Sequence, residues 1–272
     1  MDKKRFGIQA AATLLQNANF KGFFTGRIYT GELKTVCVPG LNCYSCPGAV
    51  GACPIGSLQS FLSSRPIRFP YYVVGLLLFF GAVLGRAVCG FLCPMGFLQE
   101  PIHKIPLFKK VNHFKGDKLL RKLKYVILAL MLILPLFVAL TPFFCKYVCP
   151  AGTLAGTMLA AADAQVRGLL GGLYGWKFFV LSALIVLSLI NWRPFCKYLC
   201  PLGAIYGLFN RFSLYRNTLD EDKCVSCGAC SAACRMCVDP AKTPNHSECI
   251  RCGDCVRACP TGALKCGFGE KK

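Results

Sequence analysis

Long apolar segments in this chain are each followed by two cysteines and a proline. The apolar segments cover residues 71–88, 124–144 and 175–192, and each has roughly the 20 residues that a membrane helix needs. Cysteines four residues apart lie on one face of a helical end, and the proline then turns the chain away. The sequence therefore predicts thiol ligands at the ends of membrane helices, in the motif C-x3-C-P at CGFLCP (89–94), CKYVCP (145–150) and CKYLCP (196–201).

The composition is typical of a small integral membrane protein. Of 272 residues, 54% are hydrophobic and 16% are charged, which is more apolar than an ordinary soluble domain. The net charge of +20 comes mostly from lysines and arginines that flank the apolar segments, where basic residues set the orientation of the spans. No RNA-binding aromatic motif or DNA-reading helix accompanies these charges, so we predict no nucleic-acid partner.

Basic residues in the loops predict the sides of the membrane. Lysines and arginines are concentrated in loop 89–123, which is therefore expected in the cytoplasm, and loop 25–70 is expected outside. A weaker apolar segment at 6–24 is expected to be a further span or an interfacial helix. We expect a multi-pass protein of a prokaryotic cell (inner) membrane with about four spans and both termini cytoplasmic. Residues 151–174 are expected to form a helix on the outer face, with a fifth span as the alternative.

This topology divides the membrane-proximal cysteines into an inner and an outer group. The inner pairs complement each other, because a cubane cluster takes four thiolates, and they predict one site from Cys89, Cys93, Cys196 and Cys200. Outside, Cys145 and Cys149 need two partners, and Cys46 and Cys53 are preferred because a proline follows each. Two alternatives remain open: a disulfide between Cys37 and Cys43, or a separate cubane held by Cys37, Cys43, Cys46 and Cys53.

The C-terminal cysteines carry the most specific motif. Residues 224–234 read CVSCGACSAAC and residues 249–260 read CIRCGDCVRACP, each with the spacing C-x2-C-x2-C-x3-C of bacterial ferredoxins. A zinc ribbon uses two cysteine pairs and not two such quartets. Arg235 replaces the proline that usually follows the fourth cysteine. Because the fourth cysteine of each motif reaches the other cluster, the predicted ligand sets are Cys224, Cys227, Cys230 and Cys259, and Cys249, Cys252, Cys255 and Cys234.

The predicted fold is mostly α, with two domains. Residues 1–213 form a membrane domain with cysteine-rich helix ends and the outer loop, and residues 214–272 form a small α+β cytoplasmic ferredoxin domain with two clusters. We expect four [4Fe-4S] clusters, two in each domain, with five as the alternative and a quinone as a further candidate cofactor. The histidines, His103, His113 and His246, lie outside the predicted spans and leave no paired ligands for haem b. No nucleotide-binding glycine motif is present.

Several segments together resemble a known family. VPGLNCYSCPGAVGACPIGSLQ, GRAVCGFLCPMGFLQ, RPFCKYLCPLGAIYGLFN and the twin ferredoxin motif resemble the NapH-like membrane 4Fe-4S proteins, which include the membrane halves of NosR-type proteins. The resemblance implies four membrane helices and electron transfer between quinol or cytoplasmic donors and extracytoplasmic acceptors. It matches the four inner cysteines to the cytoplasmic paired motifs of NapH. A flavin would belong to a partner, because no extracytoplasmic flavin domain is present.

We therefore expect a transmembrane electron-transfer subunit of an oxidoreductase complex, whether or not the chain is itself an enzyme. Its expected partners are a cytoplasmic ferredoxin or oxidoreductase and an extracytoplasmic acceptor or flavoprotein. The alternatives are a quinol dehydrogenase of NapH type, and an iron–sulfur redox sensor or maturation factor. Since the hydrocarbon core is about 30 Å thick, clusters at its two surfaces are too far apart for one efficient electron transfer. We expect the clusters to be sunk into the membrane.

Overall fold

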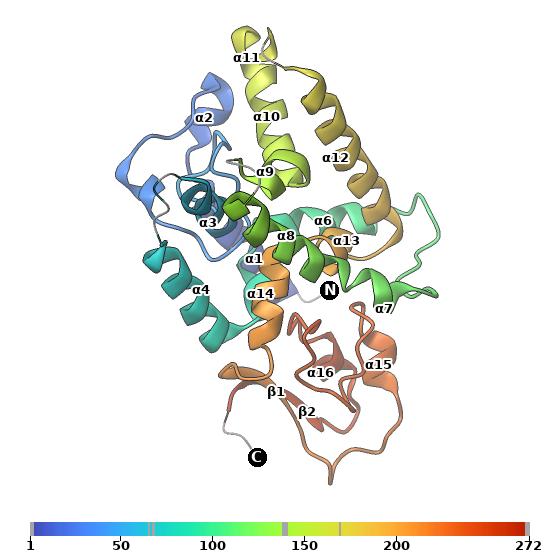
Figure 1. Cartoon of the computed structure of the whole chain (residues 1–272). Coiled ribbons are helices and arrows are strands. Elements are labelled where there is room, and N and C mark those ends of the chain that lie inside the picture. Colours follow the sequence, from blue (N-terminus) through green and yellow to red (C-terminus); the bar gives the residue numbers. More distant parts are fainter. Residues whose placement is uncertain (1–2, 65, 67–68, 138–140, 169, 270–272) are drawn as a thin grey trace.

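The computed structural model of the chain describes residues 3–64, 66, 69–137, 141–168 and 170–269. Within these residues the fold is mostly helical, with one two-stranded antiparallel sheet. The helices up to Phe209 gather above a smaller C-terminal part that holds both strands (Figure 1). The first elements are α1 (Lys3–Gln16), α2 (Phe20–Thr25), the 3-10 turn η1 (Glu32–Thr35), α3 (Pro54–Ser63), α4 (Tyr71–Leu84), α5 (Ala87–Phe91), α6 (Pro94–Lys104) and α7 (Asp117–Leu120). The remaining elements are α8 (Leu123–Phe137), α9 (Phe143–Tyr147), α10 (Pro150–Ala162), α11 (Ala164–Gly168), α12 (Gly172–Ile190), α13 (Pro194–Tyr198), α14 (Pro201–Phe209), β1 (Tyr215–Leu219), α15 (Ala229–Ala233), α16 (Asp254–Ala258) and β2 (Leu264–Phe268).

Four helices, α3, α6, α10 and α14, begin with the same residue pattern, C-P-x-G. In each, a cysteine stands directly before the helix, proline is the first helical residue and glycine is the third. Proline is suited to this position because its fixed φ fits the first turn and its missing N–H would have had no partner. The free N–H groups of a first turn favour negative charge. These four helix starts therefore suit a cysteine thiolate, at Cys53, Cys93, Cys149 and Cys200.

The apolar segments form shorter helices than the sequence led us to expect. Among the described residues, one helix, α12, is long and apolar enough to cross a membrane, with 19 residues. The expected span at 71–88 is divided into α4 and α5 at Gly85, whose φ is +53° and where a side chain would collide with the Asn210 amide oxygen. The expected span at 124–144 contains α8 and the start of α9, and residues 138–140 lie outside the described residues.

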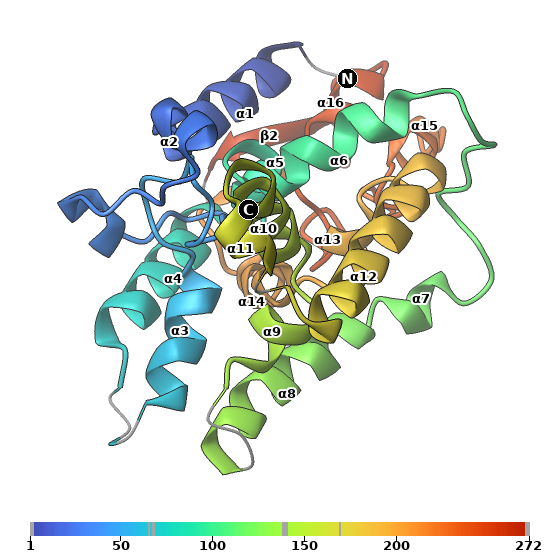
Figure 2. The ribbon, with the colours of Figure 1, turned by 90° about the horizontal axis from the view of Figure 1, so that it is seen from above.

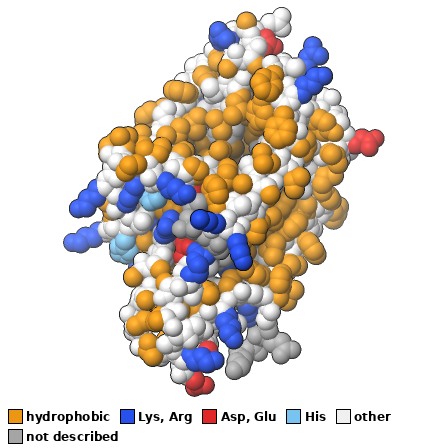
Figure 3. All heavy atoms as spheres, turned by 180° about the vertical axis from the view of Figure 1, so that it is seen from behind, with side chains coloured by type: hydrophobic (Ala, Val, Ile, Leu, Met, Phe, Trp, Pro, Cys, Tyr) orange, Lys and Arg blue, Asp and Glu red, His pale blue; other side chains and the backbone are white. Residues whose placement is uncertain are grey.

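Apolar side chains remain exposed along α4, α8 and α12. Phe79 of α4, Phe137 of α8 and Phe179 of α12 are all more than half exposed, and other large apolar side chains of these helices are also accessible. Hydrophobic side chains cover much of the face seen in Figure 3. Exposed apolar surface of this extent marks a contact with lipid or with another protein.

The first helical segment is not a continuous span. Residues 6–24 are divided between α1 and α2, which meet near Asn19, and the Asn19 amide donates to the Pro47 carbonyl at 2.7 Å. The polar side chains of α1 face inward: Gln9 donates to the carbonyl of Cys93 at 3.0 Å and Gln16 to that of Leu92 at 2.8 Å. α1 therefore packs against α5 and α6 through buried hydrogen bonds (Figure 2).

The C-terminal part has the layout of a small two-motif ferredoxin. Strands β1 and β2 pair antiparallel from Tyr215↔Phe268 to Leu219↔Leu264, and α15 packs against α16. This part contacts the helices above through Asn210, whose amide donates to the carbonyls of His246 and Cys249 at 2.9 and 2.7 Å. The second ferredoxin motif therefore lies directly beneath the helical part.

Candidate metal centres

The first ferredoxin set surrounds a cavity. Cys224, Cys227, Cys230 and Cys259 all line one cavity of 410 Å³ at the surface of the C-terminal part. Cys227 is exposed, and hydrogen bonds from Thr261 and from the backbone N–H of Leu264 lower the pKa of Cys259 to about 7. A thiol with this pKa is about half ionised at neutral pH, far more than an ordinary cysteine, and the thiolate is the form that binds iron. The cavity and its four sulfurs fit a cubane cluster.

The second ferredoxin set is more deeply placed, at Cys234, Cys249, Cys252 and Cys255. Burial raises the pKa of Cys255 to about 12, and the nearby Cys249 and Cys234 thiolates contribute to this rise. The Asn217 amide donates to the sulfur of Cys249 at 3.3 Å. The fourth cysteine of the first motif thus lies beside cysteines of the second motif, in the arrangement expected when one motif completes the cluster of the other.

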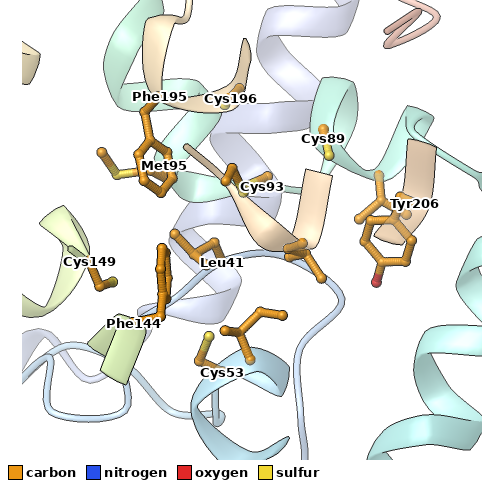
Figure 4. Close-up of a cluster of buried hydrophobic side chains, with 14 of the residues drawn as sticks. Leu41, Cys53, Cys89, Cys93, Met95, Phe144, Cys149, Phe195, Cys196 and Tyr206 are labelled. Carbon is orange, nitrogen blue, oxygen red and sulfur yellow. The ribbon is translucent and has the colours of Figure 1, made fainter. Parts of the chain in front are cut away.

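The inner cysteines of the helical part converge from two helix pairs. Cys89 and Cys93 come from α5 and the start of α6, and Cys196 and Cys200 come from α13 and the start of α14; all four are at most 5% exposed. Burial raises the pKa of Cys200, and the Cys196, Cys89 and Cys93 thiolates raise it further, so the four sulfurs share one environment. Figure 4 shows Cys89, Cys93 and Cys196 in this group.

Two arginines brace the inner cysteines. Arg86 donates to the carbonyl of Cys196 at 2.9 Å and pairs with Glu248 at 2.6 Å. Arg193 donates to the carbonyl of Cys89 at 2.6 Å and pairs with Glu100 at 2.6 Å. Both arginines are fully buried. The charge of Arg86 is satisfied inside the protein by partners from distant segments of the chain.

Arg193 is held in an unusual backbone conformation. Its φ of +51° lies in the left-handed region, and Pro194 follows it directly. This conformation costs an L-residue roughly 1–2 kcal/mol. Its guanidinium has several buried partners, Cys89, Glu100 and Gln9, which together offset this cost. Strain of this kind persists where the surroundings fix it, and it is concentrated at functional sites.

The outer group contains Cys43, Cys53, Cys145 and Cys149. Burial raises the pKa of Cys145, and the Cys149, Cys53 and Cys43 thiolates raise it further. The Cys145 sulfur lies 3.9 Å from where a side-chain carbon at Gly56 would stand, and the Cys43 sulfur lies 4.0 Å from the same point at Gly152. The start of α3 therefore faces the sulfur of Cys145, and the start of α10 faces the sulfur of Cys43.

The structure sets Cys43 against the start of α10, beside Cys149, whereas the sequence favoured Cys46 as a partner of Cys145 and Cys149. Cys43 acts electrostatically on Cys53, Cys145 and Cys149, and the pKa of each thiol is raised mainly by burial. Cys46 lies one turn away, with its N–H bonded to the Cys43 carbonyl at 3.1 Å. The Lys34 ammonium lies close to both cysteines. Among the loop cysteines, only Cys53 begins a C-P-x-G helix.

Four cysteines are not assigned to these groups: Cys37, Cys46, Cys237 and Cys266. Cys37 is buried and its sulfur lies 3.5 Å from the Ser57 hydroxyl. No disulfide joins Cys37 to Cys43 in the structure. Cys237 donates to the carbonyl of Asn112 at 3.0 Å, and Cys266 lies beside Tyr215. Both lie near ligands of the second ferredoxin set, Cys237 near Cys234 and Cys266 near Cys249.

The inner and outer groups belong to one buried core. Leu41, Phe144 and Tyr206 lie in the same apolar cluster as cysteines from both groups (Figure 4). Burial raises the pKa of Tyr206, and so do the charges of thiolates from both groups, Cys89, Cys93 and Cys53. Its hydroxyl donates to the carbonyl of Pro39 at 2.9 Å. Side chains of a single core therefore separate the two groups.

The four cysteine groups suit clusters rather than single ions. Among the described residues, no three Cys, His, Asp or Glu side chains converge as ligands of one metal ion. A cubane binds one thiolate at each of four iron atoms, so its ligands surround a space instead of meeting at a point. Beside the outer group, the Gln59 amide nitrogen is buried and finds no hydrogen-bond partner within the described part of the chain. A sulfur acceptor at this point would satisfy it.

Several residues of these sites were missed at the sequence level. Arg86, Arg193, Glu100, Glu248 and Gln59 were not identified as site residues. Two repeats in the sequence carry the signal: R-x2-C-x3-C-P occurs at 86–94 and 193–201, and C-P-x-G-x-L-Q occurs at 53–59 and 93–99. The acidic partners carry no such signal, because they come from unrelated segments.

These features define a ferredoxin-type 4Fe-4S protein with cluster-binding motifs in both parts. Comparison with known proteins agrees: 4Fe-4S binding domains match residues 69–114, 124–161 and 173–217, and a further 4Fe-4S binding domain matches residues 243–265. The chain belongs to the family of ferredoxin-type electron transport proteins that includes MauN, NapH and NosR. No solved structure matches it.

Three relatives show the extent of this similarity. The methylamine utilization ferredoxin-type protein MauN of Paracoccus denitrificans is 35% identical over 65% of this chain and 58% of its own length. The uncharacterized protein MJ0750 of Methanocaldococcus jannaschii is 30% identical over 68% of this chain and 73% of its own length. The ferredoxin-type protein NapH of Haemophilus influenzae is 29% identical over 64% of this chain and 56% of its own length. The chain thus spans little more than half the length of MauN and NapH.

Proposed function

We propose that this protein is a transmembrane electron-transfer subunit with four [4Fe-4S] clusters in series. The order is the first ferredoxin set, the second ferredoxin set, the inner group and the outer group. When bound, each cluster supplies a site that carries one electron at a time. The chain's own residues hold these sites at fixed positions, shield them from water and link them to one another.

The close contact between the second ferredoxin set and the inner group carries this proposal. Arg86 donates both to the Ser247 carbonyl, beside the second ferredoxin motif, and to the carbonyl of Cys196. A side-chain carbon at Gly90, which lies between Cys89 and Cys93 in the chain, would stand 2.5 Å from the Ile250 carbonyl oxygen. Glycine therefore permits a backbone approach that any other residue would block.

The shared core of the inner and outer groups supports the next step. Clusters at the two faces of a bilayer would be about 30 Å apart, but these cysteine groups contact one apolar core that also contains Leu41 and Tyr206. Burial in such a core excludes water and keeps the sites rigid. This arrangement favours clusters that are sunk into the membrane, as the sequence suggested.

The apolar faces of α4, α8 and α12 support a membrane location. We infer that these helices contact lipid, that loop 89–123 and both termini lie in the cytoplasm and that the outer group faces the other side. The first ferredoxin set lies at the surface, where a cytoplasmic ferredoxin or oxidoreductase would reach it. An extracytoplasmic acceptor, such as a flavoprotein, would exchange electrons with the outer group.

A specific observation favours quinol oxidation as a second candidate. A mainly apolar pocket of 240 Å³ lies among α1, α2, α6 and α10, and its lining includes Cys43, Cys46 and Pro94. It therefore adjoins the outer group and, at Pro94, the end of the first inner motif. Asn17 and Asn42 offer polar groups in its wall. A quinone fits such a pocket, because it has an apolar ring with two carbonyl oxygens. An enzyme that oxidises quinol needs a quinone site of this kind beside a redox centre.

The proposed function is tested by cluster content. We expect about sixteen iron atoms per chain, with equal acid-labile sulfide, in protein purified without oxygen. Redox titration followed by EPR should resolve signals that disappear separately when Cys145 or Cys196 is replaced by serine. About eight iron atoms per chain, with no loss in either variant, would limit the clusters to the ferredoxin domain and contradict the proposal. Turnover with a quinol analogue, abolished by Ala155→Trp in the pocket, would instead favour the quinol dehydrogenase.

A further inference from the structure

We propose that Gln59 donates a hydrogen bond to sulfur at the outer cluster and thereby raises the reduction potential of that cluster. This inference rests on the proposed function, because it requires a cluster at the outer group. Gln59 lies on α3, six residues after Cys53.

The first observation is an unpaired buried amide. Gln59 is 0% exposed, and its carbonyl oxygen accepts a hydrogen bond from the Cys145 backbone N–H at 3.2 Å. This contact fixes the orientation of the amide, since only the oxygen can accept from an N–H. Among the residues that the structure describes, the amide nitrogen then has no hydrogen-bond partner. A buried donor without a partner costs about 1–3 kcal/mol, so the site calls for an acceptor beside Cys145.

The second observation is an equivalent residue at the inner group. Gln99 stands at the same position in C-P-x-G-x-L-Q, and its carbonyl oxygen accepts from the Phe195 N–H at 3.1 Å. Its amide nitrogen donates to the sulfur of Cys196 at 3.3 Å. Cys196 and Cys145 are each the first cysteine of a C-x3-C-P motif. The inner glutamine therefore already makes the type of contact that the outer one lacks.

Each group has one such glutamine. The C-P-x-G helices α10 and α14 carry Ala155 and Tyr206 at the equivalent position. A hydrogen bond to sulfur stabilises the more negative, reduced state of a cluster and raises its potential. Gln59 thus acts as a positioning and tuning residue: its oxygen holds the Cys145 backbone, and its nitrogen lowers the energy of the added electron.

The test compares potentials in variants that keep or remove the donor. Gln59→Leu removes both amide contacts, whereas Gln59→Glu keeps an acceptor for the Cys145 N–H but removes the amide donor. We expect both variants to lower the potential of the outer cluster, shifting its oxidised-to-reduced ratio about tenfold, or ~59 mV for one electron. Gln99→Leu should shift the inner cluster instead. Ser60→Ala, an exposed change on the same helix, is the matched control.

A spectroscopic measurement on the unchanged sequence completes the test. In protein labelled with ¹⁵N in the glutamine side chains, pulsed EPR of the reduced outer cluster should detect a coupled nitrogen. The inference is overturned if this coupling is absent, or if the variants keep their iron with unchanged potentials. If Cys145→Ser loses no iron, the proposed outer cluster is itself absent, and this outcome contradicts the proposed function rather than the role of Gln59.

Discussion

Arg86 and Arg193 each donate a hydrogen bond to the cysteine motif that follows the other arginine. Arg86 donates to the carbonyl of Cys196 at 2.9 Å, and Arg193 donates to that of Cys89 at 2.6 Å. Each arginine stands three residues before the first cysteine of its own motif. The inner group is therefore built from two similar halves that exchange arginines. The outer C-x3-C-P motif has Pro142 at this position and lacks the exchange.

Replacing Arg193 by methionine should destabilise the folded protein more than a substitution at the surface does. The variant leaves the Cys89 carbonyl without this donor and Glu100 with Arg5 alone, and removing one partner of a buried ion pair costs about 3–5 kcal/mol. The lost positive charge should also lower the potential of the inner cluster. Anaerobic thermal unfolding and redox-titrated EPR measure the two effects. Arg211→Met, at an exposed position, is the control, and equal behaviour of the two variants would contradict this prediction.

The ion pairs of Glu100 predict a dependence of stability on pH. Burial alone would raise the pKa of Glu100, but Arg193 and Arg5 outweigh it and the pKa is lowered. The folded state therefore binds a proton less readily than the unfolded state, whose glutamate pKa is about 4.3. The stabilisation is complete above that pH and is lost as the pH falls through the lower, folded pKa.

The measurement for Glu100 is the free energy of unfolding in detergent, from neutral pH down to about pH 2, well below the ordinary glutamate pKa of about 4.3. Wild-type protein should exceed Glu100→Gln at neutral pH, and the difference between the two should shrink in acid. The subtraction removes the acid sensitivity of the clusters, which both proteins share. A difference that stays constant across this range would show that the Glu100 charge does not stabilise the fold.

Serine substitutions in the outer loop test whether Cys43 or Cys46 is the fourth ligand of the outer cluster. We expect Cys43→Ser to lose the outer EPR signal and about four iron atoms per chain, because a cubane needs four thiolates. Cys46→Ser, three residues away, should keep both and is the matched control. The opposite result would restore Cys46 as the ligand. Cys37→Ser should also retain the iron, since the Cys37 sulfur contacts Ser57.

The choice between Cys43 and Cys46 shows where sequence reasoning ends. The motifs identified the cysteines and grouped the inner pairs, because C-x3-C-P has a defined local geometry. The loop before α3 has none: its path depends on distant contacts, such as Lys34 to the Ala49 carbonyl at 2.6 Å and Asn42 to the Gln16 carbonyl at 3.3 Å. Such contacts leave no periodic pattern in the sequence.

The apolar helices show a second limit. Of the three apolar segments expected to span, only that of α12 forms a helix of sufficient length among the described residues. Composition did not locate the break at Gly85, which depends on close packing against Asn210 and Arg251. The acidic residues were equally hidden. Glu248 is near the second ferredoxin motif in the sequence, and only the fold brings it between Arg86 and Lys124 of the helical part.

Glu248 should control how firmly the ferredoxin domain docks on the helices. Its carboxylate pairs with both Arg86 and Lys124, and although burial opposes ionisation, these two cations lower its pKa to about 2. Glu248→Gln leaves two buried cations without their counter-charge, so we expect the docked state to lose about 3–5 kcal/mol. Each domain should keep its own clusters, because the cluster ligands are cysteines and Glu248 is not one of them.

The expected results for Glu248→Gln are faster proteolysis in the segment between α14 and β1, at 210–214, and slower electron transfer between the second ferredoxin set and the inner group. The first is measured by limited digestion, and the second by rapid reduction of the ferredoxin domain followed by freeze-quench EPR. Glu221→Gln, an exposed change just after β1, is the control. Slower transfer with full iron content would show that the contact at Arg86 joins the two halves of the electron path. Unchanged transfer would place that path elsewhere.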